Sequence, residues 1–390
     1  MGAVTPAKVL TPAATAAPSP ASPSTARAIN DRLALGLLQE EGPLTAAQLK
    51  RLTGLSRPSV ADLVERLGAA GLIEVVGESG EQRRGPNARL YGIVAGRAHL
   101  AALDVRTDSA TAVVTDLLGH PLARAALPVD AVGEAVARLA GLTREAGARE
   151  LHTVVVGAPG LVAPAGGELR DTGGLPAWHR DLVAALRETL PARVVVENET
   201  NLAALAEQRV GAARDLDSFV LLWLGAGVGA AVVLDGRLRR GASGGAGEIG
   251  FPARPRHRRV PSATDCGGRL PLPGRGARPV AALAAEHGFT RARGRKAVAG
   301  AAGEAFLDAL AERLSLGAAA VAAVLDPGCV VLGGELGRAG GPGLAARVAD
   351  RLAALTPVPT EVRATALGGP AVLEGARLAA RAAAQDDLFG

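Results

Sequence analysis

Residues 45–74, TAAQLKRLTGLSRPSVADLVERLGAAGLIE, decide the fold of the first part of the chain. Thr45 and Gln48 have the spacing of a capping box, which predicts that a helix begins here. A glycine six residues further on marks a tight turn. Ser56 is a favoured N-cap residue and Pro58 is tolerated in a first helical turn, so a second helix should follow. This stretch therefore predicts two helices joined by a tight turn.

The second of these helices has one apolar face. Its apolar residues recur at the spacing of a single helix face, and they are Val60, Leu63, Val64 and Leu67. The opposite face is polar, as in a recognition helix that lies in the major groove of DNA. We predict that Arg57 and Ser59 on this face read bases, and that Arg66 also faces the DNA.

The flanking sequence extends this pair of helices to a winged helix-turn-helix. Residues 30–40 predict a preceding helix, and residues 72–76 and 89–94 predict two β-strands joined by a polar hairpin. We expect three arginines of this wing to contact phosphates or the minor groove: Arg83, Arg84 and Arg89. The alternative is a small protein-binding module whose arginines are merely solvated.

Composition and cysteine content bound the class of protein. The chain has 390 residues, of which 48% are hydrophobic and 2% aromatic, so two or three domains with aliphatic cores are expected. Cys266 and Cys329 are far apart, which argues against a disulfide framework and for a reducing compartment. The sequence has no apolar run that could span a membrane and no signal-peptide pattern. We therefore predict a cytoplasmic protein without a membrane partner.

The net charge of +5 gives little support for DNA binding, because of where the charge lies. Residues 28–96 carry eight basic and eight acidic side chains, although the basic ones gather at 50–57 and 83–89. The excess of positive charge lies at 252–300, which holds eleven Lys and Arg. That segment could attract an acidic ligand, or it could be a solvated loop.

The pattern of elements divides the chain into three parts. Residues 1–27 are rich in Ala, Pro and Ser and predict a disordered tail. Residues 28–96 form the winged helix-turn-helix. Residues 97–390 alternate strands and helices and predict an α/β domain with two lobes, at about 97–213 and 214–390.

The two halves of the α/β domain have related patterns. The first half predicts three antiparallel strands followed by strand–helix units, and the second half begins in the same way. The segment AVVTDLLGHPL (112–122) is echoed by AVVLDGRL (231–238). The second half also predicts three helices, the last of which could pack on the first half: 306–325, 344–355 and 371–384.

Five segments in this order resemble the ROK family (repressor, open reading frame, kinase). They are GAPGLV (157–162), VVVENETNLAALAE (194–207), LGAGVG (224–229), RGASGGAGEIG (240–250) and VVLGGEL (330–336). The resemblance covers about residues 28–390 and is closest to the repressor branch of the family. It implies an N-terminal winged helix joined to a two-lobed, sugar-kinase-type domain of the actin/hexokinase fold.

The resemblance also shows where a kinase site has degenerated. The family's first phosphate turn has the form D-x-G-G-T, and here Asp104 is followed by Arg106 and Thr107 in place of the two glycines. The family's catalytic base is an aspartate, and Glu199 stands at that position. Because a shift of about 1 Å in a catalytic group can cost about 10²-fold in rate, no catalytic residue is expected. The glycines that remain in nucleotide-like loops are Gly225, Gly227, Gly229, Gly333 and Gly334.

The resemblance assigns a sugar site but no metal. It implies that Asn198, Glu199 and Glu248 contact a sugar. Family members often hold zinc through one histidine and three cysteines. Here Phe251 replaces the histidine and only Cys266 remains of the cysteines, so we predict no metal and no cofactor.

Taken together, these features predict a transcriptional regulator, a repressor of carbohydrate-related genes. Its partners would be a double-stranded DNA operator and a sugar or sugar-phosphate effector, because Arg106 could pair with a phosphate. A homodimer or homotetramer is expected from operator symmetry. One alternative is an active ATP-dependent sugar kinase with a regulatory DNA-binding head. Another is a regulator that ignores ligands and acts through protein partners.

Overall fold

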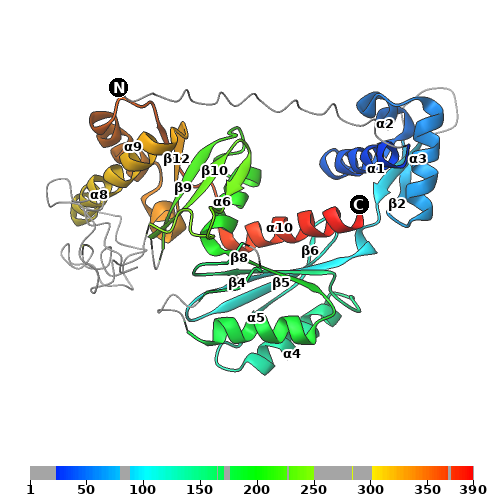
Figure 1. Ribbon diagram of the computed structural model, residues 1–390, viewed down its shortest axis with the longest axis horizontal. Helices are drawn as coiled ribbons and strands as arrows, with labels where there is room; N and C mark the ends of the chain where they lie inside the picture. The colour runs from blue at the N-terminus through cyan, green and yellow to red at the C-terminus, as the bar shows by residue number, and fades with distance from the viewer. Residues whose placement is uncertain are drawn as a thin grey trace, which may run out of the picture. The chain divides into compact units, whose positions relative to one another are not determined.

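The computed structural model describes most of the chain (Figure 1). The described residues are 23–79, 88–164, 166–170, 176–225, 228–249, 283, 301–367 and 370–389. They fall into two compact units, the described residues of 23–94 with Phe389, and those of 95–388.

The first unit is a three-helix winged helix. Its sheet has the order β1-β3-β2, and the β2–β3 turn lies outside the described residues. Its apolar core includes Leu35, Leu49 and Leu63, one from each helix. The elements are α1 (Pro23–Glu40), β1 (Leu44–Thr45), α2 (Ala46–Thr53), α3 (Arg57–Ala69), β2 (Ile73–Ser79) and β3 (Ala88–Ile93).

Local sequence signals fix the helix boundaries in this unit. The Thr45 hydroxyl accepts a bond from the Gln48 amide at 3.2 Å, and Gln48 Oε1 accepts one from the Thr45 amide at 2.8 Å, so the predicted capping box is confirmed. Gly54 ends α2 with a φ of 72°, a conformation that glycine adopts without strain. The Ser56 hydroxyl then caps α3.

The start of α1 corrects one expectation. Residues 23–27 are the first turns of this helix and not part of a disordered tail, while residues 1–22 lie outside the described part of the chain. Pro23 stands at the first helical position, where its fixed φ suits a helix and its missing N–H costs nothing. Composition alone could not predict this helix start, because a Pro and Ser content that is typical of disorder also suits the first turn of a helix.

The second unit contains two lobes of the same topology, as the sequence echo predicted. The sheet of the first lobe has the order β6-β5-β4-β7-β8, and that of the second β11-β10-β9-β12-β13. In both sheets an antiparallel three-stranded meander is followed by two parallel strands. Each lobe has its own apolar core.

In the first lobe, helices cover both faces of the sheet. Figure 1 shows α4 and α5 on one face and α10 on the other. The strands are β4 (His99–Val105), β5 (Ala110–Asp116), β6 (Pro121–Leu127), β7 (Thr153–Ala158) and β8 (Arg193–Asn198). The helices are α4 (Val132–Glu145), α5 (Trp178–Thr189), α6 (Glu199–Val210) and α10 (Ala371–Leu388). A short 3-10 turn, Ala95–Arg97, precedes β4.

The C-terminal helix α10 packs back on the first lobe, as the sequence suggested. It contacts β4, β7 and α6. A Cβ on Gly375 would overlap the carbonyl oxygen of Leu202, so this glycine permits close approach of α10 to α6. Structurally, α10 therefore belongs with the first lobe rather than with residues 214–390. Helix α6 contacts strands of both sheets and so lies between the lobes.

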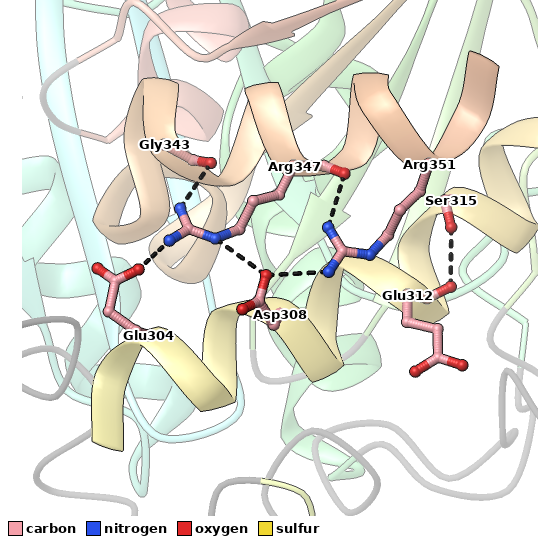
Figure 2. Close-up of polar contacts among 7 residues, drawn as sticks. All are labelled: Glu304, Asp308, Glu312, Ser315, Gly343, Arg347 and Arg351. Carbon is pink, nitrogen blue, oxygen red and sulfur yellow. Dashed lines mark hydrogen bonds and ion pairs between the residues drawn. The ribbon is translucent and has the colours of Figure 1, made fainter. Parts of the chain in front are cut away.

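In the second lobe, α8 and α9 pack on each other and are joined by ion pairs (Figure 2). Arg347 of α9 pairs with Glu304 and Asp308 of α8, and Asp308 Oδ1 also accepts a bond from Arg351 at 2.9 Å. The elements of this lobe are β9 (Phe219–Leu224), β10 (Val228–Leu234), β11 (Arg237–Arg239), α8 (Ala301–Leu325), β12 (Cys329–Gly333), α9 (Gly334–Leu355) and β13 (Glu361–Ala364).

Helix α9 begins ten residues earlier than the sequence suggested. It starts at Gly334 and is interrupted by non-helical backbone at Gly341, just before Pro342. The pattern predicted a helix only from residue 344, because glycine and proline disfavour helix interiors. The break at Gly341 agrees with that preference, and only the helical stretch from Gly334 up to this break was not predicted. No helix in the described part of the chain is long and apolar enough to cross a membrane.

Candidate functional site

The first candidate site is the polar face of α3 in the winged helix. Arg57 is the first residue of this helix and is exposed, with no bonded partner among the described residues. Ser59 is also exposed, and its hydroxyl lies 2.8 Å from that of Ser56. Arg89 is exposed on β3, while Arg83 and Arg84 lie outside the described residues.

Arg66 does not lie free on this face. Its Nε and Nη2 donate to the two carboxylate oxygens of Asp31 on α1 at 2.9 and 2.5 Å. Its Nη1 donates to Asp62 Oδ2 at 2.5 Å. Both sides of the guanidinium are occupied, so Arg66 ties α3 to α1. We correct the prediction that it is an outward-facing DNA contact, because helical spacing could not show the carboxylate of a different helix.

The second candidate site lies between the lobes of the second unit, where charged side chains gather. We call this group the interlobe cluster: Asp104, Arg106, Glu199, Glu248 and Glu335. Asp104 is the second-last residue of β4 and Arg106 lies in the following turn, while Glu335 comes from the first turn of α9 in the other lobe.

Arg106 bridges the two lobes. Its Nη1 donates to Glu335 Oε1 at 2.7 Å, and its Nε and Nη2 each lie 3.1 Å from Asp104 Oδ2. The guanidinium is therefore held between the end of β4 and the first turn of α9. Its charge is matched by two carboxylates, so the predicted role of Arg106 as a phosphate contact is not supported by this geometry.

A buried histidine holds the same turn. His179 of α5 is 1% exposed, and its Nε2 lies 3.1 Å from the carbonyl oxygen of Arg106. A carbonyl can only accept, so Nε2 carries the proton. Burial lowers the pKa of His179, which favours the neutral ring. Helix α5 was not predicted, although its buried residues follow a helical spacing.

Burial raises the pKa of three acids of the interlobe cluster and so favours their neutral forms. The pKa of Glu199, the first residue of α6, is raised to about 7 by burial and by the charge of Asp104. Burial also raises the pKa of Asp104, against the opposing effect of Arg106, and it raises the pKa of Glu248. The structure thus brings two of the predicted ligand residues, Glu199 and Glu248, within electrostatic range of the first phosphate turn.

We expect the Glu199→Gln variant to show a weaker dependence of thermal stability on pH between about 5 and 8. The folded pKa of about 7 lies above the ordinary value of 4.5, so the folded state binds more protons in this window. Stability should therefore fall as pH rises, by at most about 3 kcal/mol once pH exceeds 7. Melting curves across this range test the expectation.

Glu145→Gln is the matched control, because Glu145 is an exposed residue of α4 that pairs with Arg138 and is not part of the interlobe cluster. This control should keep the pH slope of the unchanged protein. If Glu199→Gln also kept that slope, Glu199 would not titrate near neutrality.

Asn198 has a structural role beside Glu199. Its side-chain oxygen caps α6 by accepting from the amides of Thr200 and Asn201, and its Nδ2 donates to the carbonyl of Gly160 at 2.9 Å. Asn198 thus fixes the loop after β7 to the start of α6. The adjacent Glu197 is a further residue that the sequence analysis missed. Its Oε2 accepts from Arg240 Nε at 2.7 Å, which forms a second ion pair between the lobes.

A cavity of about 340 Å³ adjoins this network. It runs along β8, and its lining includes Asn198 but neither Glu199 nor Glu248. The polar lining residues are Arg187, Glu197, Asn198, Asn201 and Arg240.

The glycines of the nucleotide-like loops permit close packing. A Cβ on Gly225 would lie 2.7 Å from Glu335 Oε2, and one on Gly229 would lie 2.9 Å from the Thr200 hydroxyl. Gly334 has a φ of +77°, and a Cβ there would lie 2.5 Å from the Leu224 carbonyl oxygen. A Cβ on Gly333 would lie 2.8 Å from a Leu221 methyl group, while Gly227 lies outside the described residues. The fold alone gives reasons for four of the five glycines.

Within the described ranges, no three His, Cys, Asp or Glu side chains are grouped so that they could hold a metal ion. Cys266 and Phe251 lie outside these ranges. Cys329 is a buried free thiol in β12.

Comparison with sequence families separates the same two parts. Residues 100–382 match the ROK family, and residues 29–85 match the MarR family. The N-acetylglucosamine repressor of Escherichia coli O6:H1 is 28% identical over 233 residues, which are 57% of this chain and 56% of that protein. The xylose repressor of Bacillus subtilis is 24% identical over 238 residues, 57% of this chain and 59% of that protein. The chain thus spans little more than half the length of the curated relatives it matches.

Solved structures show the same fold. A ROK family transcriptional regulator, a homologue of the E. coli MLC protein, aligns over 93% of this chain and 98% of its own, with a TM-score of 0.69 and 20% identity. A ROK hexokinase from Thermus thermophilus aligns over 74% of this chain and 99% of its own, with a TM-score of 0.57 and 27% identity. The predicted fold class, a winged helix-turn-helix with a sugar-kinase-type domain, is confirmed.

Proposed function

The chain belongs to the ROK family, and from this premise we propose that it is a sugar-responsive transcriptional repressor that binds operator DNA through its winged helix. ROK proteins include both repressors and kinases, as the similar proteins illustrate. The observation that favours the repressor is the ion pair of Arg106 with Asp104 and Glu335 in the first phosphate turn.

The same observation argues against phosphoryl transfer. Phosphoryl transfer depends on positioning and on cations that neutralise the phosphates. Here the guanidinium in the phosphate turn is held by two carboxylates, and Glu199 replaces the family's shorter aspartate. We propose that the kinase-like domain is a ligand-sensing and dimerisation domain without kinase activity.

Operator binding would use Arg57 and Ser59 on α3, with wing arginines Arg83, Arg84 and Arg89 on the DNA backbone or in the minor groove. A homodimer or homotetramer would place two winged helices on two half-sites. A sugar held by Glu199 and Glu248, next to Asn198, would shift the population of the DNA-competent state. The names of the repressors for N-acetylglucosamine and xylose support a carbohydrate effector.

Selection of DNA from a random library with the purified protein tests this proposal. A palindromic site that is enriched without ligand, and lost when one carbohydrate is added, is the expected result. Turnover of ATP with any sugar in the same preparation would favour the alternative, an active kinase. An enriched site that no carbohydrate releases would favour a regulator acting without small ligands.

A further inference from the structure

We propose that the effector of this chain is an unphosphorylated sugar, and that the interlobe cluster discriminates against sugar phosphates. This inference rests on the proposed function, because it concerns the ligand held by Glu199 and Glu248. It assigns the charge of the ligand, which distinguishes two chemical classes of effector.

The charge balance of the cluster is the first argument. It contains four carboxyl groups and one guanidinium, and Arg106 already donates to Asp104 and Glu335. A bound phosphate normally needs donors and positive charge that are free to pair with it. The charge of Arg124 also reaches Asp104, but Arg124 is exposed on β6. A phosphate near Glu199 would therefore lie among four carboxyl groups, while the one cation of the cluster already has two partners.

Asp104 supplies a second and independent observation. It is 5% exposed, and its Oδ1 is buried with no hydrogen-bond partner in the described part of the chain. A buried acceptor without a donor costs free energy, so it favours a ligand that brings a hydrogen-bond donor. Sugar hydroxyls and ammonium groups donate, whereas an ionised phosphate mainly accepts. Asp104 thus suits a neutral or amino sugar and opposes a phosphate.

The other acids of the cluster lie within electrostatic range of Glu199, one of the residues proposed to bind the sugar. The discrimination between a sugar and its phosphate should therefore act at the hydroxyl group that Glu199 binds. Glu199 stands where the family has its catalytic base, and Asp104, Glu335 and Glu248 all act electrostatically on its carboxyl group. A sugar hydroxyl bound at Glu199 would therefore lie within electrostatic range of three other carboxyl groups. Phosphorylation of that hydroxyl would place about two negative charges there.

Calorimetric titration of the full chain tests the inference. The probes are glucose, N-acetylglucosamine and glucosamine, each paired with its 6-phosphate. The unphosphorylated member of at least one pair should bind, with its phosphate at least about tenfold weaker. Glucosamine should bind at least as well as glucose, because its ammonium group can donate to a carboxylate.

A pair of variants separates the cluster from general charge effects. Glu335→Gln removes one negative charge and frees one side of the Arg106 guanidinium. The ratio of the affinity for a sugar to that for its 6-phosphate should therefore fall at least about threefold. Glu304→Gln is the matched control, because Glu304 also pairs with an arginine of α9 but at the α8 interface (Figure 2). This control should leave the discrimination unchanged, and melting curves should show that both variants fold.

The possible results separate the inference from the proposed function. A 6-phosphate that binds as tightly as its parent sugar, or more tightly, overturns the inference and leaves a sugar-responsive regulator in place. If Glu335→Gln and Glu304→Gln discriminate equally between a sugar and its phosphate, the inference is also overturned. The interlobe cluster would then not be the source of the discrimination. Binding of no carbohydrate from either class overturns the proposed effector site and, with it, this inference.

Discussion

Replacing Arg57 with alanine should weaken binding to the selected operator by about 1–3 kcal/mol and relax the preference at one base pair. Arg57 is exposed at the first position of α3, the end of a recognition helix that contacts base edges. Its guanidinium is unpaired within the described residues, so it can form a bidentate bond to guanine. Affinities for the operator and its single-base variants, at one salt concentration, measure this effect.

Arg66→Ala provides the control on the same helix. Because Arg66 is tied to Asp31 and Asp62, its loss should lower the thermal stability of the winged helix while the base preference is unchanged. If Arg57→Ala weakened all sequences equally, Arg57 would contact phosphate rather than a base. If it had no effect on affinity, α3 would not be the recognition helix.

Replacing Arg106 with alanine should lower the free energy of unfolding of the second unit by about 2–3 kcal/mol. The change leaves the Asp104 carboxylate, whose side chain is 6% exposed, without its cation, and it removes a bond between the lobes. The loss falls below the range for fully buried pairs because the Arg106 side chain is 35% exposed. Urea unfolding followed by circular dichroism measures the loss.

A second substitution tests the physical cause. In the Arg106→Ala background, Asp104→Asn removes the carboxylate that has lost its arginine partner and should restore part of the lost stability. Arg138→Ala removes an exposed pair with Glu145 and should cost less than about 0.5 kcal/mol. An Arg106→Ala variant as stable as the unchanged protein would show that the ion pair does not hold the lobes together.

Sequence predicted the parts of this molecule that depend on neighbouring residues. The capping box at Thr45, the cap at Ser56 and the related halves of the α/β domain follow from short motifs and repeating patterns. The short strand β13 was missed, since its four residues show no clear alternation of burial. The helical start of α9 was missed because its glycines favour a break.

The charges of the site were harder to predict because their partners are distant in sequence. Arg106 and Glu335 are separated by 229 positions, and only the docking of the two lobes brings them together. The sequence therefore suggested that Arg106 is free to bind phosphate, whereas the structure shows that two carboxylates hold it. Arg66 was misassigned for the same reason, because Asp31 lies 35 residues away on α1.

The affinity of the full chain for its selected operator, measured with and without unphosphorylated sugars, tests the central claim most directly. We expect tight binding without ligand and at least about tenfold weaker binding, equivalent to 1.4 kcal/mol, with one sugar and without ATP. Operator binding that no sugar changes, or that changes only when ATP is also present, would contradict a sugar-responsive repressor without kinase activity.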